Sequence, residues 1–185
     1  MTVSHDLDLR FRESARALGL VDLGFDVVAS PMGDLLVAAS DHGLASIWFD
    51  PDPDRDLERL ARIAGPRVLR SARSVDGARR ELDEYFSGRR HTFDLALDLR
   101  ALPSFTVSVL RELARVPYGE TATYGELASR VGRPRAARAV GTVLNRNRIP
   151  NVLPCHRVVG ASGDLVGYAG GLQRKVALLE LEGAL

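Results

Sequence analysis

The spacing of apolar residues changes near residue 100 of this 185-residue chain. Before that point, short apolar runs are separated by Gly- and Asp-containing turns at residues 30–34 and 40–43, which is typical of hairpins. Residues 93–99 (FDLALDL) alternate strictly and predict a further strand. Beyond residue 103, apolar residues recur at helical spacing. The pattern predicts an α+β protein, with an N-terminal antiparallel-sheet domain at residues 1–100 and a mainly helical domain at residues 101–185.

The same pattern predicts the individual elements. Besides residues 93–99, we expect strands at residues 25–28, 35–38 and 44–49. In the N-terminal part, we expect helices within residues 1–22 and at residues 57–63 and 75–86. In the C-terminal part, we expect helices at residues 104–116, 123–131, 135–145 and 172–182.

The charges are unevenly distributed, although the formal net charge is only +1. Residues 1–60 contain twelve acidic residues and five arginines, whereas residues 127–157 contain seven arginines and no acidic residue. A basic segment of this kind indicates either a surface that meets an anion such as nucleic acid or an ordinary solvated face.

Cys155 is the only cysteine, so neither an intramolecular disulfide nor a cysteine-rich zinc site can form. The four histidines are not spaced as metal ligands, and we expect no metal site. No apolar run approaches the length of a membrane span, and the polar N-terminus lacks the apolar core of a signal peptide. We therefore expect a cytoplasmic protein without membrane contact, because a lone thiol survives in a reducing compartment.

Two short predicted helices are joined by the sequence VGRP at residues 131–134, which is the pattern of a helix-turn-helix. The second of these helices carries small residues on one face and Arg138 on another. Small side chains would let a bulky partner approach the backbone closely. An ordinary helical hairpin is the alternative interpretation.

A second motif, PCHRV at residues 154–158, surrounds the cysteine. A thiol is a good nucleophile only as the thiolate, and neighbouring cations favour that form. His156 and Arg157 follow Cys155 directly. The alternative is a buried structural cysteine, since free cysteine is among the most buried residue types.

Several short motifs occur in one order along the chain. They are VPYGE at 116–120, TYG at 123–125, ARAVG at 137–141, Asn147, PCHRV at 154–158 and GYAGGL at 167–172. Together they resemble the O6-alkylguanine-DNA alkyltransferases, also called methylated-DNA–protein-cysteine methyltransferases, for which PCHRV is the signature. The resemblance is dense from residue 105 to residue 183 and looser over residues 25–49. It implies an RNase H-like N-terminal domain and a base-flipping DNA repair protein that needs no cofactor.

The resemblance also implies catalytic roles. Cys155 would accept the alkyl group irreversibly in a single turnover, and His156 would take its proton through a water molecule. Glu182 would orient His156, and Tyr124 would donate a hydrogen bond or proton to the leaving guanine. Asn147 would brace the turn between the recognition helix and the active site.

Further residues would contact the substrate and the DNA. The substrate-binding residues would be Tyr124, Val158, Tyr168, Ala169 and Gly170, with the carbonyls of Cys155 and Val158 accepting from the guanine amino group. The recognition helix would enter the minor groove of double-stranded DNA, with Arg138 filling the place of the flipped base. The other DNA-binding residues would be Thr123, Ala136, Ala137, Ala139 and Gly141. We expect a monomer; cooperative assembly on DNA, the largest alkyl group accepted and repair of O4-alkylthymine stay open.

Four positions depart from the family pattern. Thr106 and Leu110 replace a Gln and a Trp of the first C-terminal helix, and Arg148 replaces the proline of an Asn-Pro pair. Ala169 stands where some relatives have Ser, so only its backbone could contact the base.

Three other functions compete with alkyl transfer. A non-catalytic binder of alkylated DNA would lack the acceptor cysteine, which Cys155 argues against. A helix-turn-helix transcription regulator would leave the PCHRV motif unexplained. A Cys-His hydrolase would turn over, whereas a thioether on Cys155 has no easy route to hydrolysis.

Overall fold

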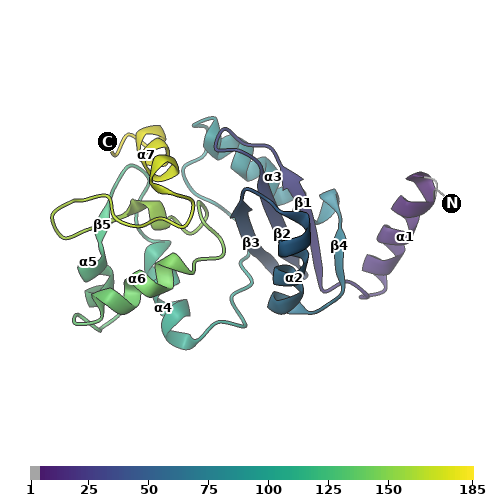
Figure 1. Ribbon diagram of the computed structural model, residues 1–185, viewed down its shortest axis with the longest axis horizontal. Coiled ribbons are helices and arrows are strands. Elements are labelled where there is room, and N and C mark those ends of the chain that lie inside the picture. Colours follow the sequence, from purple (N-terminus) through teal and green to yellow (C-terminus); the bar gives the residue numbers. More distant parts are fainter. Residues whose placement is uncertain (1–4) are drawn as a thin grey trace.

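The computed structural model describes residues 5–185 and places a sheet-containing half beside a helical half (Figure 1). The elements of the first half are helices α1 (His5–Ala17), α2 (Pro53–Ala64) and α3 (Ala72–Phe86), with strands β1 (Leu23–Val28), β2 (Leu35–Ser40), β3 (Gly43–Phe49) and β4 (Val68–Arg70). The three hairpin strands and the three helices that the sequence predicts here are therefore present. The first four residues of the predicted N-terminal segment lie outside the described residues.

The sheet is mixed, which corrects the expected antiparallel sheet. Its strand order is β3-β2-β1-β4; β1 and β2 are antiparallel, as are β2 and β3, but β4 runs parallel to β1. The connection through α2 brings the chain back in the same direction, as a parallel pair requires. The pattern did not reveal β4, because three residues are too few to show a period.

Strand β2 is buried on both faces, which explains its continuous apolar run. Leu35 and Val37 belong to the main core, together with residues of α3. Leu36 and Ala38 belong to a second core with Leu60 of α2. Side chains alternate across a strand, so α2 and α3 cover opposite faces of the sheet.

Residues 93–99 are not a strand, which corrects the clearest strand prediction. The segment makes one isolated parallel bridge, in which the Leu44 amide donates to Ala96 and the Asp98 amide donates to Leu44. A side chain binds one further backbone group of the segment: the Asp94 amide donates to Glu81 at 2.8 Å. The alternating leucines still pack against the main core. Alternation therefore predicted which side chains pack against the core, but not a paired strand.

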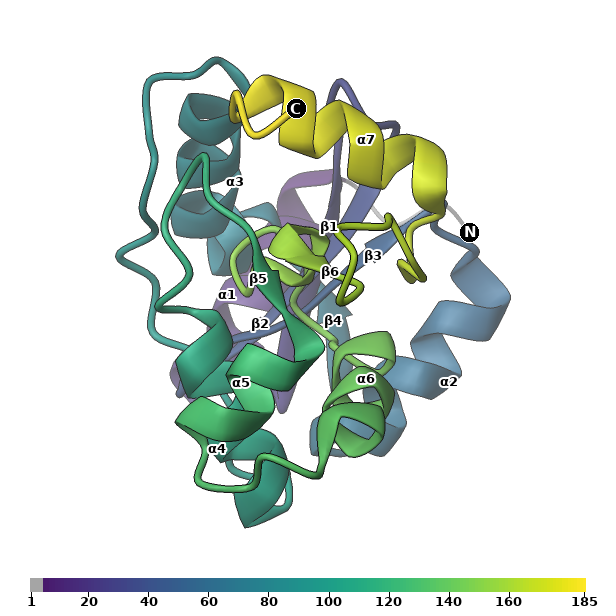
Figure 2. The same ribbon diagram turned by 90° about the vertical axis from the view of Figure 1, so that its left-hand side faces the viewer.

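The helical half contains α4 (Ser104–Leu113), α5 (Tyr124–Arg130), α6 (Ala137–Asn145) and α7 (Leu172–Leu181). Helix α4 ends three residues earlier than expected, at Leu113 rather than residue 116. Helices α5 and α6 form the helix-turn-helix and pack on α4, while α7 lies on the opposite side of this half (Figure 2). The domain boundary near residue 100 stays a prediction.

Two short elements lie between these helices. Strands β5 (Ala122–Thr123) and β6 (Val158–Val159) pair in parallel, and the 3₁₀ helix η1 (Cys155–Arg157) precedes β6 directly. One apolar core extends from β1, β2 and α3 through α4–α6 to η1 and β6. The cysteine is therefore held where the two halves share a core.

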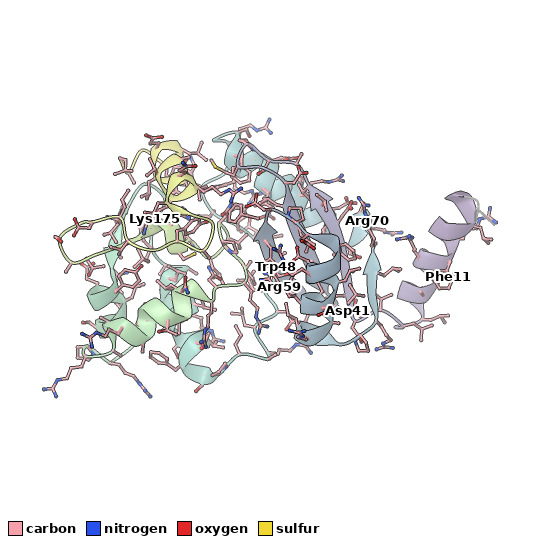
Figure 3. All side chains as sticks on the ribbon, in the orientation of Figure 1. Phe11, Asp41, Trp48, Arg59, Arg70 and Lys175 are labelled. Carbon is pink, nitrogen blue, oxygen red and sulfur yellow. The ribbon has the colours of Figure 1, made fainter. Side chains whose placement is uncertain are left out.

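Helix α1 projects away from the sheet, and its Phe11 is exposed (Figures 1 and 3). Within residues 5–185, no helix is both long enough and apolar enough to span a membrane.

Candidate active site

The Cys155 side chain is buried at the start of η1 and is held by Asn147. Asn147 donates one hydrogen bond from Nδ2 to Cys155 Sγ at 3.2 Å and another to the Leu153 carbonyl at 2.8 Å. Its Oδ1 accepts from the Ile149 amide at 3.0 Å. Asn147 thus ties the segment after α6 to the cysteine.

The environment of Cys155 favours the neutral thiol. Burial raises its pKa to about 11, although the hydrogen bond from Asn147 and the charge of Lys175 act in the opposite direction. Arg157 does not activate the thiol as the sequence suggested, since its guanidinium binds Glu182 instead. A reaction at neutral pH therefore needs a base that removes the thiol proton.

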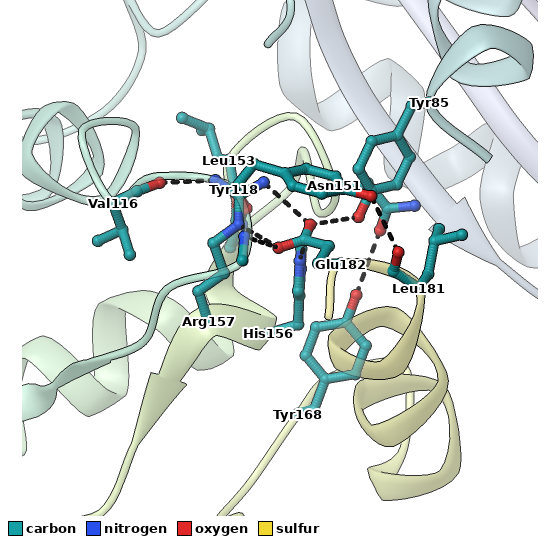
Figure 4. A network of polar contacts seen from close by, with 12 residues as sticks. Tyr85, Val116, Tyr118, Asn151, Leu153, His156, Arg157, Tyr168, Leu181 and Glu182 are labelled. Atoms are coloured by element: carbon teal, nitrogen blue, oxygen red, sulfur yellow. Dashed lines mark hydrogen bonds and ion pairs between the residues drawn. The ribbon is translucent and has the colours of Figure 1, made fainter. Parts of the chain in front are cut away.

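His156 is the predicted base, and a buried carboxylate holds its ring (Figure 4). Its Nε2 lies 2.9 Å from Glu182 Oε1, and both side chains are fully buried. Burial alone raises the pKa of Glu182, but hydrogen bonds from His156 and Arg157 lower it to about 2. An ionised carboxylate can only accept, so Nε2 carries the ring proton.

The other ring nitrogen, Nδ1, then carries no proton. It is buried and forms no hydrogen bond within residues 5–185. Burial lowers the pKa of His156, which keeps the ring neutral at physiological pH. A neutral imidazole with one free acceptor nitrogen is the form that a general base requires.

A pocket of about 160 Å³ opens onto Cys155. It is lined by Tyr124, Gly141, Leu144, Asn145, Cys155, Gly167, Tyr168 and Ala169. The structure thus brings together residues from α5, α6, η1 and the loop before α7, including four of the predicted catalytic and substrate-binding residues. Gly170 lies just outside this lining, and a Cβ there would come within 2.7 Å of the Tyr168 ring.

The predicted DNA-binding residues lie along α5 and α6. Arg138 is exposed in the first turn of α6, and Ala136 and Ala137 begin that helix. Gly141 faces the Tyr124 ring, where an added Cβ would lie in ordinary contact at 3.7 Å. Thr123 has a structural role, since its hydroxyl caps α5 by accepting from the Glu126 amide at 3.1 Å.

Comparison with known proteins decides the family. Residues 104–184 match the DNA binding domain of 6-O-methylguanine DNA methyltransferase, and residues 25–99 match its ribonuclease-like domain. This chain belongs to the 6-O-methylguanine DNA methyltransferase family. The family predicted from the sequence motifs is therefore confirmed for both halves. Helix α1 lies outside both matched regions.

Named members of the family match over most of their length. The methylated-DNA–protein-cysteine methyltransferase of Mycobacterium leprae is 54% identical over 153 residues, covering 83% of this chain and 88% of the relative. That of Methanosarcina barkeri is 42% identical over 159 residues, covering 85% and 96%. The crystal structure of Mycobacterium tuberculosis OGT in complex with DNA has a TM-score of 0.76 at 39% identity, covering 87% of this chain and 93% of that one. These matches confirm the predicted activity class, direct repair of methylated DNA.

Sequence reasoning missed one charged group of this methyltransferase, Lys175 (Figure 3). Its ammonium is buried and donates to the Val158 carbonyl at 2.6 Å and to the Val166 carbonyl at 2.8 Å. It thereby ties β6 to the loop that lines the pocket. Val158 itself is fully buried and does not line the pocket at Cys155. Lys175 is the only lysine in the chain, which contains 24 arginines. This unusual choice of residue was the signal in the sequence that could have drawn attention to it.

The departures from the family pattern have different surroundings. Leu110 is buried in the main core, so an apolar side chain suits its position. Arg148 is half-buried, and its carbonyl accepts from the Ile47 amide of β3 at 2.7 Å. Ala169 is exposed at the pocket, where its backbone is accessible.

Among residues 5–185, no cluster of three His, Cys, Asp or Glu side chains could hold a metal ion.

The Glu182 carboxylate should make stability depend on acid pH. Its pKa is lowered from 4.5 to about 2 in the folded protein. Between these two pH values the carboxyl group is therefore protonated in the unfolded chain but ionised in the folded protein. This contribution, roughly 3 kcal/mol, is complete above pH 4.5 and is lost as pH falls towards 2. We expect Glu182→Gln to melt below the parent protein at pH 7. The difference should shrink in thermal melts between pH 4.5 and pH 2; a constant difference would contradict the assignment.

Proposed function

We propose that this protein repairs O6-methylguanine in DNA by transferring the methyl group to Cys155. The observation that carries the proposal is the position of the only cysteine: Cys155 lines a pocket, and its Sγ accepts a hydrogen bond from Asn147 Nδ2 at 3.2 Å. Sγ attacks the methyl carbon, so that the S–C bond forms as the C–O6 bond breaks. His156 Nδ1 takes the thiol proton through a water molecule, and the Tyr124 hydroxyl donates to the departing guanine.

The pocket supports recognition of an extrahelical base. Tyr124 and Tyr168 are its aromatic residues, and Gly141 leaves the space at the α6 side open. The protein binds DNA. Helix α6 enters the minor groove, and Arg138 fills the place that the flipped base leaves in the stack. The carbonyls of Cys155 and Val158 and the amide of Ala169 recognise the guanine edge.

The reaction occurs once per molecule. The product is a thioether, and Cys155 has no second cysteine beside it to regenerate the thiol. The protein acts as a monomer and needs no cofactor. It works in the reducing cytoplasm, where the Cys155 thiol is not oxidised to a disulfide that could no longer accept the methyl group.

Intact-mass measurement tests the function directly. The protein is incubated with an excess of duplex DNA that carries one O6-methylguanine, and the modified residue is located by peptide mapping. We expect one added methyl group per protein, on Cys155, and unmethylated guanine in the DNA. Binding without transfer would favour a lesion binder, and more than one repaired base per protein would favour a turning-over enzyme.

Arg138 should matter more for duplex DNA than for the free base. Flipping a base costs a few kcal/mol, so losing the residue that occupies the gap should slow duplex repair by about tenfold or more. Arg138→Ala should leave the reaction with free O6-methylguanine within about twofold of the parent rate, since that base needs no flipping.

Arg130→Ala is the charge-matched control, because Arg130 is exposed on α5 outside the recognition helix. It should change both reactions little. Equal losses on duplex and free base in Arg138→Ala would show that Arg138 has another role.

A further inference from the structure

The Glu182 carboxylate receives hydrogen bonds from both halves of the molecule (Figure 4). Oε1 accepts from His156 Nε2 at 2.9 Å and from Arg157 Nη2 at 2.9 Å. The same oxygen accepts from the Tyr85 hydroxyl at 2.6 Å. Tyr85 belongs to α3, ninety-seven residues before Glu182, so a side chain of the ribonuclease-like half reaches the group that orients His156.

Tyr85 is held rigidly in this position. Its side chain is fully buried. Its ring packs at 5.3 Å between centroids against both Phe86 and Phe93, and at 6.2 Å edge-to-face against Tyr118. Burial raises the pKa of Tyr85, and the neighbouring Glu182 charge raises it further. The phenol therefore stays protonated and always donates.

We propose that Tyr85 is a positioning residue for methyl transfer, through which the N-terminal half sets the basicity of His156. The inference rests on the proposed function of Cys155 and His156. The Tyr85 hydroxyl shares Glu182 Oε1 with His156 and so withdraws part of that oxygen's acceptor strength. It also fixes the carboxylate, which in turn fixes the His156 ring.

Removing the hydroxyl should raise the pKa of His156. Without the Tyr85 donor, Oε1 becomes a stronger acceptor for the His156 Nε2 proton, which stabilises the imidazolium. The titratable and charged groups facing this pair are Tyr85 from α3, Tyr118 from the loop after α4, Cys155 and Arg157 from η1, Tyr168 from the loop before α7, and Lys175 from α7. Of these, Tyr85→Phe removes one neutral donor and leaves every charge in place.

Tyr85→Phe and Tyr118→Phe form a matched pair for the test. Tyr118 belongs to the same aromatic cluster, but its hydroxyl donates to the Leu181 carbonyl at 2.9 Å instead of Glu182. Both variants lose one hydroxyl and keep both rings. The full-length proteins are compared at a temperature below both melting transitions.

The first measurement is the single-turnover rate of transfer from O6-methylguanine duplex DNA between pH 5 and pH 9. We expect Tyr85→Phe to slow transfer at pH 7 by about 3- to 10-fold, as the loss of one hydrogen bond implies. The acid limb of its profile should move to higher pH, because the raised pKa protonates more of His156. Tyr118→Phe should keep the parent profile.

The second measurement is an NMR titration of the His156 ring in each protein, which does not depend on activity. A purely structural role would lower the melting temperature of Tyr85→Phe without moving this pKa. An unmoved pKa and acid limb in Tyr85→Phe, or equal shifts in Tyr118→Phe, would overturn the inference. Absence of transfer in the parent protein would instead refute the proposed function, and the His156 titration would still test Tyr85.

Discussion

Replacing Cys155 by alanine should give a protein that binds methylated DNA but transfers no methyl group to itself. The substitution removes the only thiol in the chain, so nothing remains that could form a stable thioether. The fold should survive, because Asn147 keeps its bonds to the Leu153 carbonyl and the Ile149 amide. Transfer is measured with DNA labelled in the methyl group, and binding by titration of the same duplex.

Asn147→Ala is an informative companion to this variant. It keeps the thiol but removes the donor to Sγ and the brace of the turn. Transfer should then slow rather than stop, because that hydrogen bond favours the thiolate. Labelled protein recovered from Cys155→Ala would show that another residue accepts the methyl group.

Arg157→Ala should cause the largest loss of stability among these variants. The guanidinium is buried and donates to both Glu182 oxygens, at 2.7 and 2.9 Å, and to the Val116 carbonyl at 2.6 Å. Removing it leaves a buried carboxylate without its charge partner and a carbonyl without a donor, which costs about 3–5 kcal/mol. For a chain of this size, the melting temperature should fall by roughly 6–20 °C.

The control for this effect is Arg115→Ala. Arg115 pairs with Glu112 on the surface, where its side chain is 73% exposed. Such exposed pairs contribute less than about 1 kcal/mol. Both variants are compared by thermal melts at pH 7 and low salt. Similar melting temperatures for the two would show that the Arg157–Glu182 pair does not hold this part of the structure together.

The elements predicted from the sequence depended on long apolar patterns. The hairpin strands at residues 25–49 and helix α6 were found because turns and small residues bound them clearly. The strand predicted at residues 93–99 was wrong for a physical reason. Their leucines are partly buried against the main core, but the segment pairs with β3 only at the isolated Leu44–Leu97 bridge, and its Asp94 amide donates to the Glu81 side chain. Strand β4 was missed because it is short and its partner is remote in sequence.

Some features of the candidate site could likewise be predicted from the sequence, and others could not. The family could be identified from the sequence, because a short motif and its order along the chain carry that information. The same resemblance singled out Cys155, His156 and Glu182 as the predicted site residues. The pairing of the charged groups, by contrast, became visible only in the folded protein. Arg157 is only two residues from the thiol in sequence yet binds Glu182, and Tyr85 reaches the same carboxylate from the other half of the chain. Hydrogen-bond partners depend on where side chains end in three dimensions, and burial, which raises the pKa of Cys155 and lowers that of His156, exists only once both halves share one core.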